Sequence, residues 1–213
     1  MFKKNVYAYS MIGLAIIIAL VALPYLPDQV PTHWGVNGEV DGYSSKYFGA
    51  FMAPFFMIII YFSMVFAPRI DPKKKNYPKF NKNFTGFKNV MITFFFGLHM
   101  ATIIYSLGYE FSMDKFIIIG VGCLFAYIGN IMPQIKPNYF MGLRTPWTLD
   151  NEEVWVKSHR IGGKIMFVGG IAILLSAFIN GMTSFIVIIT VTVVVSVGIT
   201  VISYFISKEV KNR

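Results

Sequence analysis

The residues best suited to chemistry lie in a polar segment between two apolar stretches. They are two arginines, two tryptophans and a histidine: Arg144, Trp147, Trp155, His159 and Arg160. An arginine guanidinium holds five donors in one plane and suits a phosphate or a carboxylate. A charge that only orients a membrane protein needs no such geometry, and both interpretations of Arg144 stay open. As an enzyme site, this set suits binding an anion better than breaking a bond.

Motifs of catalytic and metal centres are missing from the sequence. It contains no Ser-His-Asp spacing, HExxH, CxxC, phosphate-binding glycine loop or pair of membrane aspartates. Cys123 is the single cysteine, which excludes a disulfide framework and a cysteine-based metal site. The sequence therefore predicts a protein that is not an enzyme and that needs no cofactor or metal.

A second group of candidate residues lies in residues 24–47. His33 is either a ligand or proton switch, or a plain surface histidine of a polar loop. Trp34 and Tyr43 suit a membrane interface, where aromatic side chains gather. Asn37-Gly38 favours a tight type I′ turn, because both central residues of that turn need a positive φ. We therefore expect a small ordered hairpin that lies over the helices.

The elements that must position these residues are six long apolar stretches: residues 6–23, 48–67, 88–107, 115–133, 163–180 and 184–206. Each has about the 20 residues that a helix needs to cross a bilayer. Charged residues form 14% of the chain, against about 25% in soluble domains. We predict an all-α integral membrane protein with six transmembrane helices.

Basic residues sort to one side of these stretches. Seventeen of the 19 Lys and Arg residues, Lys3 and Lys4 among them, fall on the side of the N-terminus, and only Lys46 and Lys115 fall opposite. Because basic residues face the cytoplasm, we predict that both termini are cytoplasmic and that residues 24–47 are extracellular. The net charge of +9 then faces anionic lipids. Membrane lipids are thus expected partners, and direct nucleic-acid binding is not expected.

The polar segment at residues 132–163 carries the signals of a helix start. Asp150 and Glu153 stand at the positions of an N-cap and its capping partner. A helix should begin near Asn151 and run to the glycine pair at 162–163, a flexible entry to the fifth span. On this helix Trp155 and His159 share one face. Both tryptophans of the segment are expected at the level of the lipid head groups.

His99 lies inside the third apolar stretch. An ionisable residue at membrane depth is costly and points to a function such as proton transfer. A neutral histidine can also hydrogen-bond across helices. No Asp, Glu, Lys or Arg lies mid-span to exchange a proton with it, which favours the structural role.

A longer pattern runs through residues 129–163. Its members are Gly129-Asn130, Pro133, residues 136–140, Gly142, residues 144–149, Trp155, His159-Arg160 and Gly163. This pattern resembles the signature of the bacterial SdpI-like family. Residues 31–46, with His33, Trp34, Gly38, Asp41-Gly42 and Lys46, are similar to the short domain that often precedes that signature.

The resemblance implies a membrane immunity protein that protects the producing cell from a secreted, membrane-active peptide toxin. It also implies a second partner, a cytoplasmic repressor that the toxin-bound protein holds at the membrane. The candidate binding residues are His33, Trp34 and Asp41 outside, and Asn138, Arg144, Trp147, Trp155, His159 and Arg160 inside. The expected parts are residues 1–67, a helical hairpin with loop 24–47, and residues 68–213, a four-helix remainder with loop 132–163.

Two other functions stay open. A small transporter or exporter of a peptide or lipid-like molecule should have polar residues and interrupted helices near the midplane, where this sequence offers His99 and scattered glycines. A membrane enzyme that acts on lipid head groups would need Arg144, His159 and Arg160 as its site.

Overall fold

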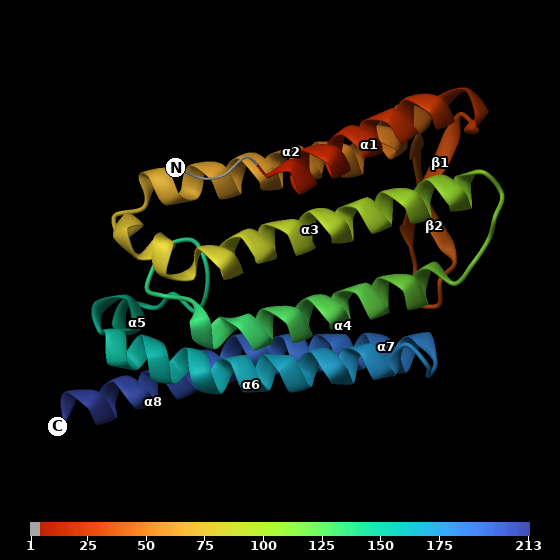
Figure 1. Cartoon of the computed structure of the whole chain (residues 1–213). Helices are drawn as coiled ribbons and strands as arrows, with labels where there is room; N and C mark the ends of the chain where they lie inside the picture. The colour runs from red at the N-terminus through yellow and green to blue at the C-terminus, as the bar shows by residue number, and fades with distance from the viewer. Residues whose placement is uncertain (1–4) are drawn as a thin grey trace. The chain divides into compact units, whose positions relative to one another are not determined.

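Helices dominate the structure, a computed structural model that describes residues 5–213 (Figure 1). Lys3 and Lys4, counted above with the basic residues, lie outside the described residues. Six helical segments are long and apolar enough to cross a membrane: Val6–Tyr25, Lys46–Ile70, Lys74–Ser106, Met113–Gln134, Glu152–Ser176 and Gly181–Lys211. The chain is an all-α multi-span membrane protein, as the sequence predicted.

Two of the helices start well before their apolar stretches. α3 (Tyr77–Ser106) begins in a basic segment and departs from helical geometry at Phe80, where φ is −132°. α6 (Glu152–Ser176) begins with two acidic residues in its first turn. These polar turns carry the helices beyond the apolar core, so they place residues of the basic segments on ordered backbone.

The helices form two compact units. One comprises Met1–Val65 and Lys88–Ile117, and the other comprises Phe66–Phe87 and Ile118–Arg213. The third span thus joins the first two in one unit. The domain boundary between residues 67 and 68 expected from the sequence stays a prediction.

In the first unit, α1 (Val6–Ala22) presents small residues to α2 (Lys46–Ile70) and α3. Ala8, Ala15 and Ala19 have no exposed surface. Met57 and Ile92 pack with the first two of these alanines in one buried cluster. Lipid tails are as apolar as the side chains, so close packing over small residues is what favours association of such helices.

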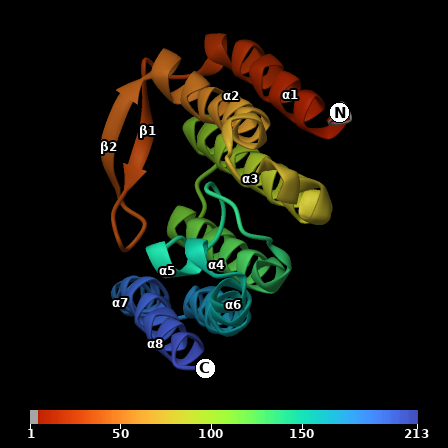
Figure 2. The same cartoon turned by 90° about the vertical axis from the view of Figure 1, so that its left-hand side faces the viewer.

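The expected hairpin is confirmed, but its predicted turn is wrong. β1 (Gln29–Trp34) and β2 (Val40–Ser45) pair antiparallel and lie side by side in Figure 2. Asn37 has a negative φ, and Gly38 alone in this turn has a positive one, 86°. The Gly38 N–H donates to the Gly35 carbonyl (3.0 Å), and the Gly35 N–H donates to the Glu39 carbonyl (2.7 Å). This pattern is a type I turn followed by a glycine bulge, which needs only one left-handed residue.

The hairpin is fixed at its base and near its turn. At the base, Lys46 Nζ donates to Asp28 Oδ1 (2.9 Å), and this hydrogen bond together with the lysine charge lowers the pKa of the Asp28 carboxyl. A Cβ at Gly49 would lie 2.1 Å from a methyl of Val30, so β1 packs directly on the first turn of α2. Near the turn, the Trp34 ring meets Tyr105 edge-on at 5.7 Å.

In the second unit, α4 (Met113–Ile131) and α6 touch backbone to backbone. A Cβ at Gly129 would lie 2.4 Å from the Phe167 nitrogen, and one at Gly163 would lie 2.7 Å from the Gly129 carbonyl oxygen. The expectation of a flexible entry at the 162–163 glycine pair is therefore wrong. α6 is one unbroken helix there, because these glycines admit a neighbouring backbone rather than a hinge.

The sixth span contains a departure from α-helical geometry. α7 (Gly181–Val193) passes into the π-helical segment η4 (Val194–Gly198) and then into α8 (Ile199–Lys211). Shorter elements complete the fold: the 3₁₀ turns η1 (Leu23–Tyr25), η2 (Lys74–Asn76) and η3 (Met132–Gln134), and the single-turn helix α5 (Pro146–Asp150).

Candidate functional site

The signature loop, residues 135–151, is built around the side chain of Asn138. Its Oδ1 accepts the N–H groups of Phe140 (2.9 Å) and Met141 (2.7 Å). Its Nδ2 donates to the carbonyls of Lys136 (2.9 Å) and Met141 (3.0 Å). Asn138 is fully buried. It therefore shapes the loop from inside and offers a partner no surface.

A buried carboxylate that the sequence analysis missed ties this loop to the start of α3. Asp71 is 1% exposed. It accepts the Lys73 N–H (2.6 Å), the Tyr77 hydroxyl (2.8 Å) and the Tyr139 N–H (2.8 Å). Two signals in the sequence could have pointed to it: Asp71 is the only acid between residues 69 and 83, and it follows directly on the second span.

Arg144 is held by the backbone rather than by an acid. Its Nη1 donates to the Tyr139 carbonyl (2.6 Å), and the Tyr139 N–H in turn binds Asp71. The residue is exposed, and among residues 5–213 no carboxylate forms a salt bridge with it. A guanidinium has five donors, so the remaining ones are available to an anion.

Arg144 lies on the wall of a cavity of about 310 Å³. Apart from Arg144 and Ser196, the side chains around it are apolar: Phe87, Ile128, Met132, Ile135, Phe140, Met141, Leu143, Met166, Val195 and Ile199. This volume is at the lower end of the range for small-ligand pockets. The structure thus places beside a largely apolar cavity an arginine that forms no ion pair with any carboxylate of residues 5–213.

Trp155 and His159 lie on one face of α6, as predicted, but both are fully buried. Their rings stack with centroids 4.0 Å apart. The Leu143 N–H donates to His159 Nε2 (3.1 Å), so the ring proton sits on Nδ1, which donates to the Trp155 carbonyl (2.9 Å). Trp155 Nε1 donates to the Ile135 carbonyl (2.8 Å). Every ring nitrogen of this pair thus has a hydrogen-bond partner inside the protein. A direct contact of either residue with a partner stays a prediction.

The helix start was predicted one residue too early. The N-cap of α6 is Asn151, whose Oδ1 accepts the N–H groups of Glu153 (2.8 Å) and Val154 (3.2 Å), whereas Asp150 ends α5. α5 arises because Thr145 forms a capping box with Thr148 and Pro146 stands in the first turn, where a missing N–H costs nothing. Adjacent Asp and Asn residues are both good caps, and the extra turn of α5 settles which one acts.

The other two residues of the inner set differ in exposure. Trp147 Nε1 donates to the Ser203 hydroxyl (2.9 Å), and its ring meets Tyr204 at 5.4 Å, so it fixes α5 to α8. Arg160 is exposed. The surface that a partner can reach on this part of the second unit therefore includes Tyr139, Phe140, Arg144 and Arg160.

The outer set lies in the first unit. His33 Nδ1 and Asp41 Oδ1 are 2.5 Å apart across the hairpin, and both side chains are largely solvent-accessible. Trp34 is half-buried, and its Nε1 has no hydrogen-bond partner among the described residues. His99 of α3 is fully buried in this unit. Neither of its ring nitrogens has a partner in hydrogen-bond geometry within residues 5–213.

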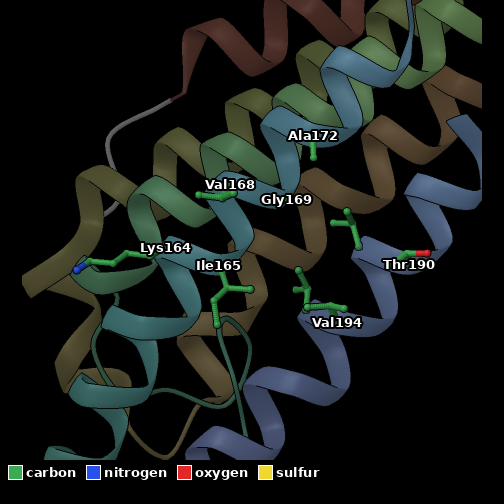
Figure 3. Close-up of a pocket in the computed structure, with 9 residues that line it drawn as sticks. Lys164, Ile165, Val168, Gly169, Ala172, Thr190 and Val194 are labelled. Atoms are coloured by element: carbon green, nitrogen blue, oxygen red, sulfur yellow. The ribbon is translucent and has the colours of Figure 1, made fainter. Parts of the chain in front are cut away.

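A second cavity, of about 460 Å³, lies between α6 and the α7–η4 segment (Figure 3). Its lining is apolar except for Thr190 and Lys164. In Figure 3 the Lys164 side chain points away from the other lining residues. Such a groove suits a lipid tail, because most of its lining side chains are apolar.

Comparison with known proteins finds two matched segments, and each contains one group of candidate residues. Residues 134–204 match the SdpI/YfhL protein family, and residues 11–58 match a domain of unknown function, DUF1648. Immunity protein SdpI of Bacillus subtilis (strain 168) is 30% identical over 207 residues, which cover 97% of each chain. The chain belongs to the SdpI family. No solved structure matches the chain.

The two matches divide the candidate residues between them. The SdpI-family match covers the signature loop, α6 and the cavity wall at η4, and the other match contains the hairpin. Asp71 lies in neither matched segment, although its hydrogen bonds hold the signature loop in place. As a member of the SdpI family with six membrane-crossing helices, the protein is a multi-pass protein of the cell membrane.

Proposed function

We propose that this SdpI-family protein is a non-enzymatic immunity protein that protects its cell from a secreted, membrane-active peptide. The observation that carries the proposal is the 30% identity to an immunity protein along 97% of the chain. The site geometry supports it as well. His159 is a buried, neutral base with both ring nitrogens occupied, and Arg144 Nη1 is bound to a backbone carbonyl.

The hairpin is the surface that we propose meets the peptide. It is ordered, it carries the exposed His33–Asp41 pair, and it lies on the side of the membrane with few basic residues. The contact between the Trp34 and Tyr105 rings fixes this surface to α3. A rigid hairpin loses little conformational freedom on binding, which favours affinity.

The second partner in this proposal is a cytoplasmic repressor bound by the signature loop. The exposed aromatic and basic residues Tyr139, Phe140, Arg144 and Arg160 suit a protein contact, because aromatic side chains and arginine dominate such contacts energetically. Asn138, Trp155 and His159 then act by holding the loop in shape. For repressor binding to respond to the peptide, the two faces must be coupled through a change in the helices.

The experiment is survival of a sensitive bacterium that expresses the full chain. Survival against a membrane-active peptide of the sporulation-delaying type should rise, and Asp41→Asn should reduce it by removing the negative charge beside His33. Glu110→Gln is the matched control, since it removes an exposed acid from another loop of the same unit. Unchanged killing by several such peptides, at verified membrane abundance of the chain, rejects the immunity function.

Export of the peptide is the second candidate function. The π-helical segment η4 and the two cavities beside it favour this alternative, since transporters use interrupted helices near their binding sites. Peptide labelled with a fluorophore distinguishes the two. An exporter lowers the amount of peptide held by cells, whereas a sequestering immunity protein raises it.

A further inference from the structure

The cavity beside Arg144 combines an apolar lining with one charged side chain. Its wall is apolar on α3, α4, α6 and the α7–α8 segment, and its one charged residue lacks an acidic partner among residues 5–213. An arginine guanidinium that no carboxylate occupies can pair with a phosphate or a carboxylate through two parallel N–H groups. No carboxylate among residues 5–213 takes that place in the structure.

Three observations define the chemistry of the missing partner. It carries an anion that two parallel N–H groups can bind, because Arg144 uses only Nη1 on the Tyr139 carbonyl. It also carries an apolar part, because the lining side chains other than Arg144 and Ser196 have no polar group. It reaches the cavity at the end of the helices where the basic residues gather, which is where head groups of a bilayer lie.

We propose that this cavity binds an anionic phospholipid, with the phosphate on the Arg144 guanidinium and the first part of one acyl chain in the apolar chamber. The bilayer surrounds the protein and supplies this molecule at high local concentration. A zwitterionic lipid has the same tail but brings its own cation beside the phosphate, so the guanidinium favours the anionic head group. This inference does not depend on the immunity function.

Hydrogen bonds within the protein already fix the position of the Arg144 side chain. Asp71 fixes the Tyr139 N–H, and the Tyr139 carbonyl fixes Nη1 of Arg144. Gly142, with φ of 101°, keeps the loop against the His159 ring, where a Cβ would lie 2.3 Å from Nε2. A side chain that is already placed loses less rotamer freedom when it binds.

The second cavity supplies an internal comparison. It is larger and equally apolar, but Lys164 points away from it (Figure 3). We expect it to accept any acyl chain regardless of head group. Lys164→Gln therefore removes one positive charge from α6 without touching a residue of the Arg144 cavity, and it is the matched control for Arg144→Gln.

The test measures lipid binding to the full chain in neutral detergent by native mass spectrometry. Phosphatidylglycerol and phosphatidylcholine with identical acyl chains are titrated separately. We expect the wild type and Lys164→Gln to prefer phosphatidylglycerol by at least about tenfold in Kd, or about 1.4 kcal/mol. Arg144→Gln should lose this preference while keeping weak binding of both lipids. Ser196→Phe, which fills the cavity, should weaken binding of both lipids.

Several results would overturn the proposal. Equal preference in Arg144→Gln and the wild type shows that the head group is not bound by Arg144. Displacement of the lipid by inorganic phosphate at equal concentration shows an anion site without a tail site. Binding of a synthetic toxin peptide that the lipid cannot displace assigns the cavity to the peptide.

If Arg144→Gln does not fold, as judged by circular dichroism, Arg144→Lys takes its place. A several-fold loss of preference is expected for Lys, because an ammonium cannot form the paired contact, and an unchanged preference overturns the proposal.

Discussion

Arg144 is oriented by a backbone carbonyl, and this makes a conservative change at that position informative. A charge that only set topology would work equally well as lysine. In the structure Nη1 is already bound to Tyr139, so the remaining donors can meet an anion only in the planar arrangement of a guanidinium.

We therefore expect Arg144→Lys to reduce protection of cells even though the charge is kept. Arg213→Lys is the matched control, because Arg213 is exposed and its ion pair with Glu209 is one that a lysine can keep. Survival is measured at equal membrane abundance of both variants. Full protection by Arg144→Lys would assign this arginine to topology alone.

Asp71 is the residue whose loss should disturb the signature loop most. Asp71→Asn keeps the shape but turns an amide N–H₂ toward one of its three donors, at a cost of about 1–3 kcal/mol. The expected result is a lower Tm of the purified protein and earlier proteolysis of the loop. Asp150→Asn, at an exposed position, should leave both unchanged, and a Tm of Asp71→Asn equal to that of the wild type contradicts the role given to this carboxylate.

At the scale of elements, the apolar runs and local signals predicted most of the fold. The six spans and the hairpin follow from composition and turn residues, and the shared face of Trp155 and His159 follows from helical spacing. The features that the sequence did not predict depend on contacts between segments that lie far apart in the sequence. Asp71 bonds Tyr139 across 68 positions, and the role of Gly163 appears only when the Gly129 backbone lies against it.

The contact between α4 and α6 makes a specific prediction for glycine. Gly129→Ala places a methyl 2.4 Å from the Phe167 nitrogen, and backbone cannot move aside as a side chain can. We expect a loss of about 1–3 kcal/mol in unfolding free energy, measured by unfolding in detergent. Gly13→Ala in α1 meets nothing within 4 Å and should be neutral or stabilising by up to about 1 kcal/mol. Equal behaviour of the two variants would contradict the close helix contact.

For the whole molecule, the orientation in the membrane stays a prediction from charge. In a variant with Cys123 replaced, a cysteine at the exposed hairpin residue Asn37 should react with an impermeant thiol reagent on intact cells. A cysteine at the exposed Lys75 should react only after lysis, because 17 of the 19 basic residues lie on its side. Labelling of Lys75→Cys from outside would reverse the topology.

The hydrogen bonds of Asp71 also bear on how the chain is made. One carboxylate joins residue 77 to residue 139, and the loop at residue 143 is closed by His159 of the next helix. During synthesis Asp71 emerges well before any of its partners in the signature loop. Its bond to the Tyr139 N–H must wait until the fourth span and the first residues of the following loop have left the ribosome. A nascent chain stalled before residue 139 therefore leaves Asp71 with only its local partners, the Lys73 N–H and the Tyr77 hydroxyl.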